Sequence, residues 1–475
     1  MAETPSAPTP PPAGPNALRP PPIPAPPPRA PRTFGATLKL IVIGGLVVAL
    51  LVPLALIGSL VHERLGRRDE AVREITATWG QEQIVAGPVL IVPYRQRVKS
   101  WKEQVVNGRP ERVEAIDTVV ARAYFLPETL TVDGSLNPSR RHRGIYEAVV
   151  YDGTIRLDAR FAPPSFEEWK VAPEDILWED AEVDLAVTDL RGTRQTLMLK
   201  TGDREVPMLP GCRIPGAGTG IRSRLTPAGA LDAPFDARIE LTLNGSRSIR
   251  LAPLGRDNDV TLKSTWPDPS FQGDFLPATR TVGPEGFEAN WKVSYYGRKC
   301  PPQWTDAGRS EPVGVADSLF GVDLVSVVDT YRLVERSTKY GILFVALTFT
   351  AFFLFEVLAT LRVHPLQYTL VGAALCLFYL ALLSLSEIVP FGAAYTAGAA
   401  ACTLLIALYA GKALRSGRRS LIVGAGLGAT YGFLYVILRL QDLSLLAGTV
   451  GLFLALAAVM YATRNIDWYA QDGRR

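Results

Sequence analysis

The sequence reads GILFVALTFTAFFLFEVLATLRVHPLQYTLVGAALCLFYLALLSL from Gly341 to Leu385, which is two apolar runs joined by a short loop. Each run is close to the ~20 residues that a helix needs to cross a hydrocarbon core about 30 Å thick. Three more runs follow, and the five are Gly341–Leu361, Leu366–Leu385, Ile388–Ala410, Leu421–Leu438 and Leu443–Ala462. Five such runs in succession exclude soluble core helices, so this stretch predicts a transmembrane helix bundle.

A sixth apolar run, Leu40–Val61, lies alone near the N-terminus. Lipid offers backbone amides no hydrogen-bond partner, so every run is predicted to be a helix and the long intervening segment to lie outside the bilayer. The first run lacks a small-residue cleavage site and follows a long tail, which favours an uncleaved signal anchor. Apolar residues at near-helical spacing in Glu63–Thr78 predict that this helix continues as a stalk, which ends at Gly80.

The charges of the short loops predict the orientation. With a cytoplasmic N-terminus, the inner loops and tail carry eight positive charges and the outer loops carry one. The positive-inside rule therefore places both termini in the cytoplasm and the large segment outside it. The predicted parts are a disordered proline-rich cytoplasmic tail (1–34), a signal-anchor helix (35–62), an extracytoplasmic β-rich domain with a helical stalk (63–336), a five-helix bundle (337–463) and a cytoplasmic tail (464–475).

The segment between Gly87 and Val334 alternates short strand-like runs with turn residues. Hairpins are predicted around Asp152-Gly153, Asn244-Gly245 and Asp189–Gly192, because such residues accept the positive φ angles of tight turns. Short strands separated by regular turns indicate a sandwich or two stacked sheet units. The predicted fold class is a polytopic α-helical membrane protein with six transmembrane helices, arranged 1 + 5, and a large extracytoplasmic sandwich-like β-rich domain inserted between helix 1 and helix 2.

The composition sets limits on function. The net charge of +4 comes partly from loop arginines that topology explains, so no nucleic-acid partner is predicted. Two of the four cysteines, Cys376 and Cys402, lie in apolar runs, which leaves Cys212 and Cys300 outside them. In an oxidising compartment these two could form a disulfide, and nothing in the sequence shows that they are close.

Several motifs together resemble the CreD family of bacterial inner-membrane proteins. They are WGQ (Trp79–Gln81), STWPDPSFQGDFLP (Ser264–Pro277), GFEANW (Gly286–Trp291), VERS (Val334–Ser337), FLFE (Phe353–Glu356), HPLQY (His364–Tyr368), LSE (Leu385–Glu387) and TRNIDWY (Thr463–Tyr469). The resemblance runs from about residue 37 to 469 and leaves out only the proline-rich tail. It implies an inner-membrane protein of cell envelope integrity, with a role in stress tolerance and no known enzymatic activity.

Glu356 is the sharpest candidate for a functional residue, since it lies inside the second predicted membrane helix. A carboxylate there is costly unless it is protonated, paired or facing a polar cavity. It could handle a proton or ion or lock helices together, or it could reach water or pair with Arg362 or His364 near the interface. Glu387, at the end of the third helix, is interpreted as a loop residue at the outer surface.

The weaker candidates each have a structural interpretation. His364 precedes Pro365 in a tight loop, and a structural hairpin is favoured over a chemical role. Trp266 and Trp291 belong to an aromatic group that is either a recognition surface or core packing under irregular loops. An acidic run could bind a divalent cation, and a solvated face is favoured; its residues are Glu174, Asp175, Glu179, Asp180, Glu182 and Asp184.

Catalytic patterns are missing from the sequence. The three histidines, His62, His142 and His364, are scattered over stalk, outer domain and inner loop, so no metal cluster or catalytic triad has its parts together. We therefore expect no enzymatic activity, metal or cofactor.

The leading hypothesis is an envelope protein whose outer domain engages an envelope protein or cell-wall component, with the lipid bilayer as its surroundings. The alternative is a transporter or channel that uses the bundle and Glu356. Oligomeric state is left open.

Overall fold

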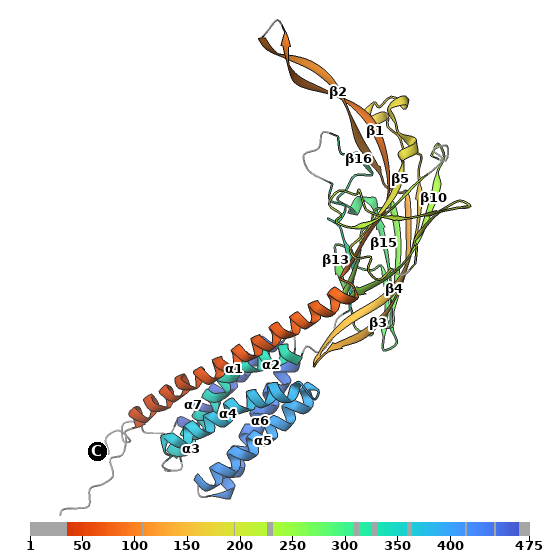
Figure 1. Ribbon diagram of the computed structural model, residues 1–475. Coiled ribbons are helices and arrows are strands. Elements are labelled where there is room, and N and C mark those ends of the chain that lie inside the picture. The colour runs from red at the N-terminus through yellow and green to blue at the C-terminus, as the bar shows by residue number, and fades with distance from the viewer. Residues whose placement is uncertain are drawn as a thin grey trace, which may run out of the picture.

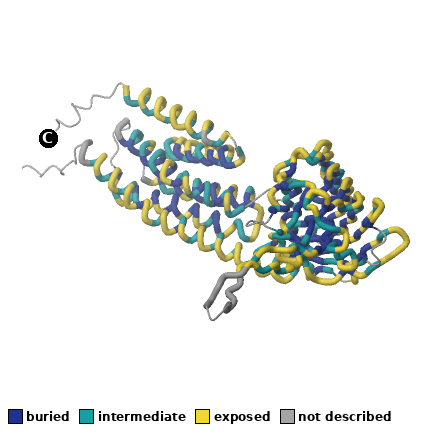
Figure 2. Tube along the Cα trace, turned by 90° about the horizontal axis from the view of Figure 1, so that it is seen from above, coloured by how far each residue is buried: buried dark blue, intermediate teal, exposed yellow. Residues whose placement is uncertain are grey.

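The computed structural model describes residues 36–106, 109–193, 195–225, 231–307, 313–324, 330–358, 363–413, 416–440 and 443–464. The proline-rich tail and the C-terminal tail after Arg464 lie outside the described residues. Figure 1 shows two bodies, a helix bundle and an elongated β-rich domain, joined by one long helix. Figure 2 shows that buried residues gather inside each body.

The joining helix is α1 (Ala36–Trp79), which has 44 residues and therefore a length of about 66 Å. It contains both the predicted anchor and the predicted stalk without a break, and it ends immediately before Gly80 as predicted. Buried residues Leu50, Leu54, Ile57 and Val61 recur at helical spacing. They form the stripe that packs against the other membrane helices, where Leu54 lies beside Gly341 and Leu50 beside Gly372.

The bundle follows the β-rich domain. It consists of α2 (Thr330–Lys339), α3 (Gly341–Leu358), α4 (Pro365–Ser386), α5 (Phe391–Ala413), α6 (Gly417–Arg439) and α7 (Ser444–Thr463). Among the described residues, α1, α4, α5, α6 and α7 are each long and apolar enough to cross a membrane, and α2 with α3 meet the same criterion together as a pair bent by 44°. The predicted arrangement of one helix and then five is confirmed.

The β-rich domain contains two sheets. The first sheet has the order β13-β17-β11-β1-β5-β9-β8, with β2 on β1 and β16 on β2; its strands are β1 (Gln83–Val106), β2 (Arg109–Phe125), β5 (Glu182–Val187), β8 (Leu209–Pro210), β9 (Gly220–Arg224), β11 (Ser248–Leu251), β13 (Pro269–Gly273), β16 (Gln303–Thr305) and β17 (Phe320–Leu324). The second sheet has the order β14-β15-β12-β3-β4-β10-β6-β7; its strands are β3 (Thr129–Arg143), β4 (Tyr146–Phe161), β6 (Met198–Thr201), β7 (Arg204–Pro207), β10 (Phe235–Ser246), β12 (Asp257–Ser264), β14 (Thr279–Gly283) and β15 (Gly286–Ser294).

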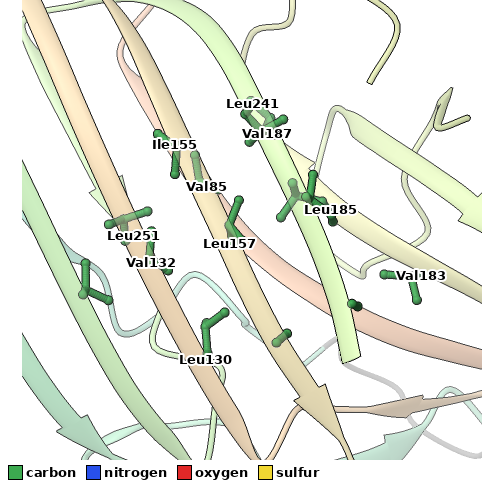
Figure 3. Close-up of a cluster of buried hydrophobic side chains, with 14 of the residues drawn as sticks. Val85, Leu130, Val132, Ile155, Leu157, Val183, Leu185, Val187, Leu241 and Leu251 are labelled. Carbon is green, nitrogen blue, oxygen red and sulfur yellow. The ribbon is translucent and has the colours of Figure 1, made fainter. Parts of the chain in front are cut away.

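The two sheets share one apolar core, which confirms the sandwich-like prediction. Residues of β3 alternate between exposed and buried, as a strand with one solvated face requires. Figure 3 shows that Leu130 and Val132 of β3 lie in the same cluster as Val183 and Leu185 of β5 in the other sheet. Burial of aliphatic side chains between two sheets supplies the main driving force for this domain to fold.

All three predicted hairpins are wrong. Asp152-Gly153 lies inside β4 and Asn244-Gly245 inside β10, and these two strands pair directly, with Asn244 opposite Asp152. The glycines serve close packing and not a turn, since a Cβ at Gly245 would lie 2.3 Å from the Tyr151 hydroxyl group. The third segment, Asp189–Gly192, connects β5 of one sheet with β6 of the other.

Candidate functional site

Glu356 is buried near the end of α3, with 7% of its surface exposed. Its Oε1 accepts a hydrogen bond from the Val363 backbone N–H at 3.0 Å, and its Oε2 accepts one from the Tyr368 hydroxyl at 3.1 Å. The Lys39 ammonium of α1 forms an ion pair with Oε1. We call Lys39, Glu356, Val363 and Tyr368 the far-side clasp, because they lie at the end of the bundle away from the β-rich domain.

The loop after α3 positions two members of this clasp. His364 is the N-cap of α4: its Nδ1 accepts a hydrogen bond from the Leu366 N–H at 3.2 Å, and its N–H donates to Gln367 Oε1 at 3.1 Å. Pro365 occupies the first turn, where its missing N–H costs nothing. His364 itself is exposed and acts as a cap, the geometry of the structural hairpin that the sequence favours.

The far-side clasp links α1 to the consecutive helices α3 and α4, which come much later in the chain. A carboxylate with an adjacent ammonium and two hydrogen-bond donors is stable in a low-dielectric environment, whereas either charge alone is costly. Lys39 is a partner that the sequence interpretation missed, since it weighed Arg362 and His364. Two facts together point to it: Lys39 precedes the first apolar run, and Glu356 lies near the same end of the second one.

Glu387 takes part in a second cluster at the other end of the bundle. Its Oε1 lies 3.5 Å from Arg64 Nη1 of α1 and accepts a hydrogen bond from the Tyr331 hydroxyl of α2 at 3.3 Å. Arg64 also donates a hydrogen bond to Tyr146 of β4. We call Arg64, Tyr146, Tyr331 and Glu387 the domain-side clasp. Glu387 lies in the turn that follows α4, as the sequence predicts, and its side chain in addition joins the bundle to α1.

The two candidate tryptophans are core residues, so the recognition-surface alternative is wrong for them. Trp291 is fully buried, its ring centroid lies 5.5 Å from that of Phe320, and its Nε1 donates to the Phe275 carbonyl at 3.2 Å. Trp266 is buried at 8% exposure under the Arg140 guanidinium, which lies 5.6 Å above its ring. Both rings fill the sandwich.

Part of the acidic run is buried, so the solvated-face interpretation is wrong for Glu182 and Asp184. Both lie on β5, on the face of the first sheet opposite the main core. Arg213 covers this face: its N–H donates to Asp184 Oδ2 at 2.5 Å, and its Nη1 lies 2.9 Å from Glu182 Oε1. Arg222 Nη1 lies 3.7 Å from Glu182 Oε2. The alternation of residues along β5 shows that Glu182 and Asp184 share a face. It does not show that Arg213, later in the chain, covers that face.

Burial of Asp184 has a consequence for stability. Desolvation raises the pKa of its carboxyl from 3.8 to about 7, against the opposing effect of the Arg213 N–H. The folded state therefore binds this proton more tightly than the unfolded state does, and stability falls as pH rises from about 4 to about 7. At one pKa unit per ~1.4 kcal/mol, the loss is at most about 4 kcal/mol.

We expect Asp184→Asn to remove this pH dependence and to leave the protein at least as stable as the wild type at pH 8. The measurement is the midpoint of thermal denaturation of the detergent-purified protein between pH 5 and pH 8. The matched control is Asp180→Asn, whose side chain is half exposed. An identical pH slope in wild type and Asp184→Asn would contradict the assignment.

Cys212 and Cys300 are both free thiols, so the disulfide that the sequence allowed is not formed. They pack against the same cluster beside the first sheet. Burial raises the pKa of the Cys212 thiol to about 11, and it also raises the pKa of Cys300. Such thiols are poorly reactive.

Within the part of the chain that the structure describes, no three His, Cys, Asp or Glu side chains are placed to hold a metal ion.

Comparison with known proteins covers both bodies of the structure. Residues 35–469 match the sequence family described as inner membrane protein CreD. A relative, inner membrane protein CreD of Escherichia coli (strain K12), is 33% identical over 426 residues, which cover 90% of this chain and 92% of the relative. The matched range therefore spans the helices, the β-rich domain and the positions of both clasps.

Proposed function

Because the chain belongs to the CreD family of inner membrane proteins, we propose that it is a non-enzymatic protein of cell envelope integrity and stress tolerance. Its β-rich domain engages an envelope protein or a cell-wall component, and both termini lie in the cytoplasm. The bundle serves as the platform on which this domain is mounted.

The observation that carries the proposal is the way in which α1 is fixed. At its outer end, Trp79 Nε1 donates to the Tyr151 carbonyl at 3.2 Å, and Glu74 forms an ion pair with Arg143 at 2.7 Å. Along the membrane it is held by the domain-side clasp and the far-side clasp. A domain that is fixed to its anchor by a continuous helix is suited to present a surface at a defined height and orientation.

The alternative, a transporter or channel, requires Glu356 to exchange a proton or an ion. The environment of Glu356 supports the mounting role instead, because one oxygen already has Lys39 and the Val363 N–H as partners and the other has Tyr368. A carboxylate neutralised by a fixed ammonium holds helices together. The two functions are separated by the paired substitution described in the Discussion.

The proposal is tested by cross-linking in intact cells. A photoreactive p-benzoylphenylalanine is placed at three exposed positions of the β-rich domain, Trp101, Leu209 and Leu276, and at the exposed Leu408 of α5 as a bundle control. We expect adducts with extracytoplasmic envelope material from at least one domain position and lipid adducts from position 408. Adducts with cytoplasmic proteins would overturn the orientation, and an absence of adducts from all three domain positions would overturn the proposed partner.

A further inference from the structure

The turn between β3 and β4 projects from the sandwich. The pairing of β3 with β12 ends at Leu136, and the pairing of β4 with β10 ends at Val150. Beyond these residues the two strands pair only with each other, up to Arg143 opposite Tyr146. Gly144, with φ of 61°, makes the turn. Figure 1 shows that this end of the hairpin points toward the bundle, beside α2. We call Arg141–Ile145 the hairpin tip.

The contacts of Tyr146 fix the height of the tip relative to the bilayer. Tyr146 accepts a hydrogen bond from Arg64, which lies three residues after the first apolar run ends at Val61. Its ring centroid lies 6.3 Å from that of Tyr331, and Tyr331 in turn donates to Glu387. Glu387 caps α4, whose 22 residues span about 33 Å, close to the thickness of a hydrocarbon core. The tip therefore lies level with the domain-side end of the membrane helices.

The tip has the chemistry of a membrane interface. Ile145 is 54% exposed at the turn, and the neighbouring Arg141, His142 and Arg143 are exposed as well. An exposed apolar side chain next to the aromatic pair of Tyr146 and Tyr331 suits the boundary between acyl chains and headgroups.

Contacts with α1 draw two basic side chains of the tip away from the membrane end of the helix. The Arg141 guanidinium lies 4.3 Å above the Trp79 ring, and Arg143 pairs with Glu74 at 2.7 Å. Glu74 and Trp79 lie about 20 and 27 Å along α1 from Val61, so these two guanidinium groups do not reach the level of Ile145.

We propose that the hairpin tip docks on the bilayer leaflet that faces the β-rich domain, with Ile145 at the acyl boundary. This inference goes beyond the proposed function, because it concerns the membrane that holds the protein and not an envelope partner. It adds a contact to the lipid surface that lies to the side of α1, so that the domain rests on two supports and cannot tilt freely about the helix.

The test uses the full-length purified protein in nanodiscs, where no other protein is present. Ile145→p-benzoylphenylalanine is irradiated and lipid adducts are measured by mass spectrometry. The negative control carries the probe at Trp101, which is 68% exposed on the β1–β2 ribbon at the end of the domain away from the bundle (Figure 1). The positive control carries it at Leu454, which is 62% exposed on the membrane helix α7.

We expect lipid adducts at positions 145 and 454 and none at position 101. The proposal is overturned if position 145 gives no lipid adduct while position 454 does. That outcome does not bear on the cross-links of the domain to an envelope partner.

Discussion

The Glu356→Gln variant is expected to be less stable than the wild type by about 3 kcal/mol, because Lys39 is left without its carboxylate in the bundle. The Lys39 side chain is about one-fifth exposed, so it can still turn toward water, which keeps the loss at the lower end of the range for broken buried pairs. The measurement is the thermal denaturation midpoint of the detergent-purified protein, together with its abundance in membranes.

The decisive companion is the double variant Lys39→Met with Glu356→Met. Replacement of both charges by apolar groups leaves no unpaired ion, so we expect it to recover most of the stability lost in Glu356→Gln. If the bundle serves only as the platform for the β-rich domain, we expect this double variant also to restore envelope integrity in cells. A stable double variant that fails to do so would instead support the transporter alternative.

A control for this experiment is the ion pair of the exposed Lys339 with the partly exposed Glu335, 2.8 Å apart in α2. Lys339→Met should cost less than about 1 kcal/mol, since exposed ion pairs contribute little. A loss as large as that in Glu356→Gln would show that any charge change in this region destabilises the protein.

Trp291→Ala is expected to lower the stability of the β-rich domain by about 3 to 5 kcal/mol. The ring is fully buried between Phe271 and Phe320, whose centroids lie 5.7 and 5.5 Å away, and its removal leaves both a cavity and the Phe275 carbonyl without its donor. The expected readout is rapid cleavage of the domain in limited proteolysis, with the membrane helices still protected by detergent.

The matched control is Trp101→Ala, because Trp101 is 68% exposed on the β1–β2 ribbon. We expect its proteolysis to follow that of the wild type. Comparable cleavage of the two variants would contradict the core assignment of Trp291.

The membrane helices could be predicted closely from the sequence, because lipid imposes one rule on every span: about 20 apolar residues in a hydrogen-bonded helix. The run Leu366–Leu385 corresponds to α4 (Pro365–Ser386) with a difference of one residue at each end. The family resemblance, drawn from short motifs, is confirmed over residues 35–469. These features depend on local composition, which the sequence states directly.

The features that could not be predicted depend on contacts between distant segments. Glycine next to Asp or Asn is typical of a turn, yet Gly153 and Gly245 lie in neighbouring strands of one sheet, and only the fold shows that Tyr151 needs the space beside Gly245. In the sequence, Glu182 and Asp184 have the pattern of a solvent-exposed strand face. In the fold, Arg213 covers that face. Lys39 and Glu356 are 317 positions apart, and no local pattern joins them.

The continuity of α1 has a mechanical consequence. A hydrogen-bonded helix transmits force along its axis, whereas a flexible linker would take up a pull by uncoiling. With Trp79 bonded to the sandwich and Lys39 bonded to Glu356, α1 acts as a strut between the two ends of the molecule. A force applied to the β-rich domain would therefore pass along α1 and load the Lys39 ion pair at the opposite end of the bundle.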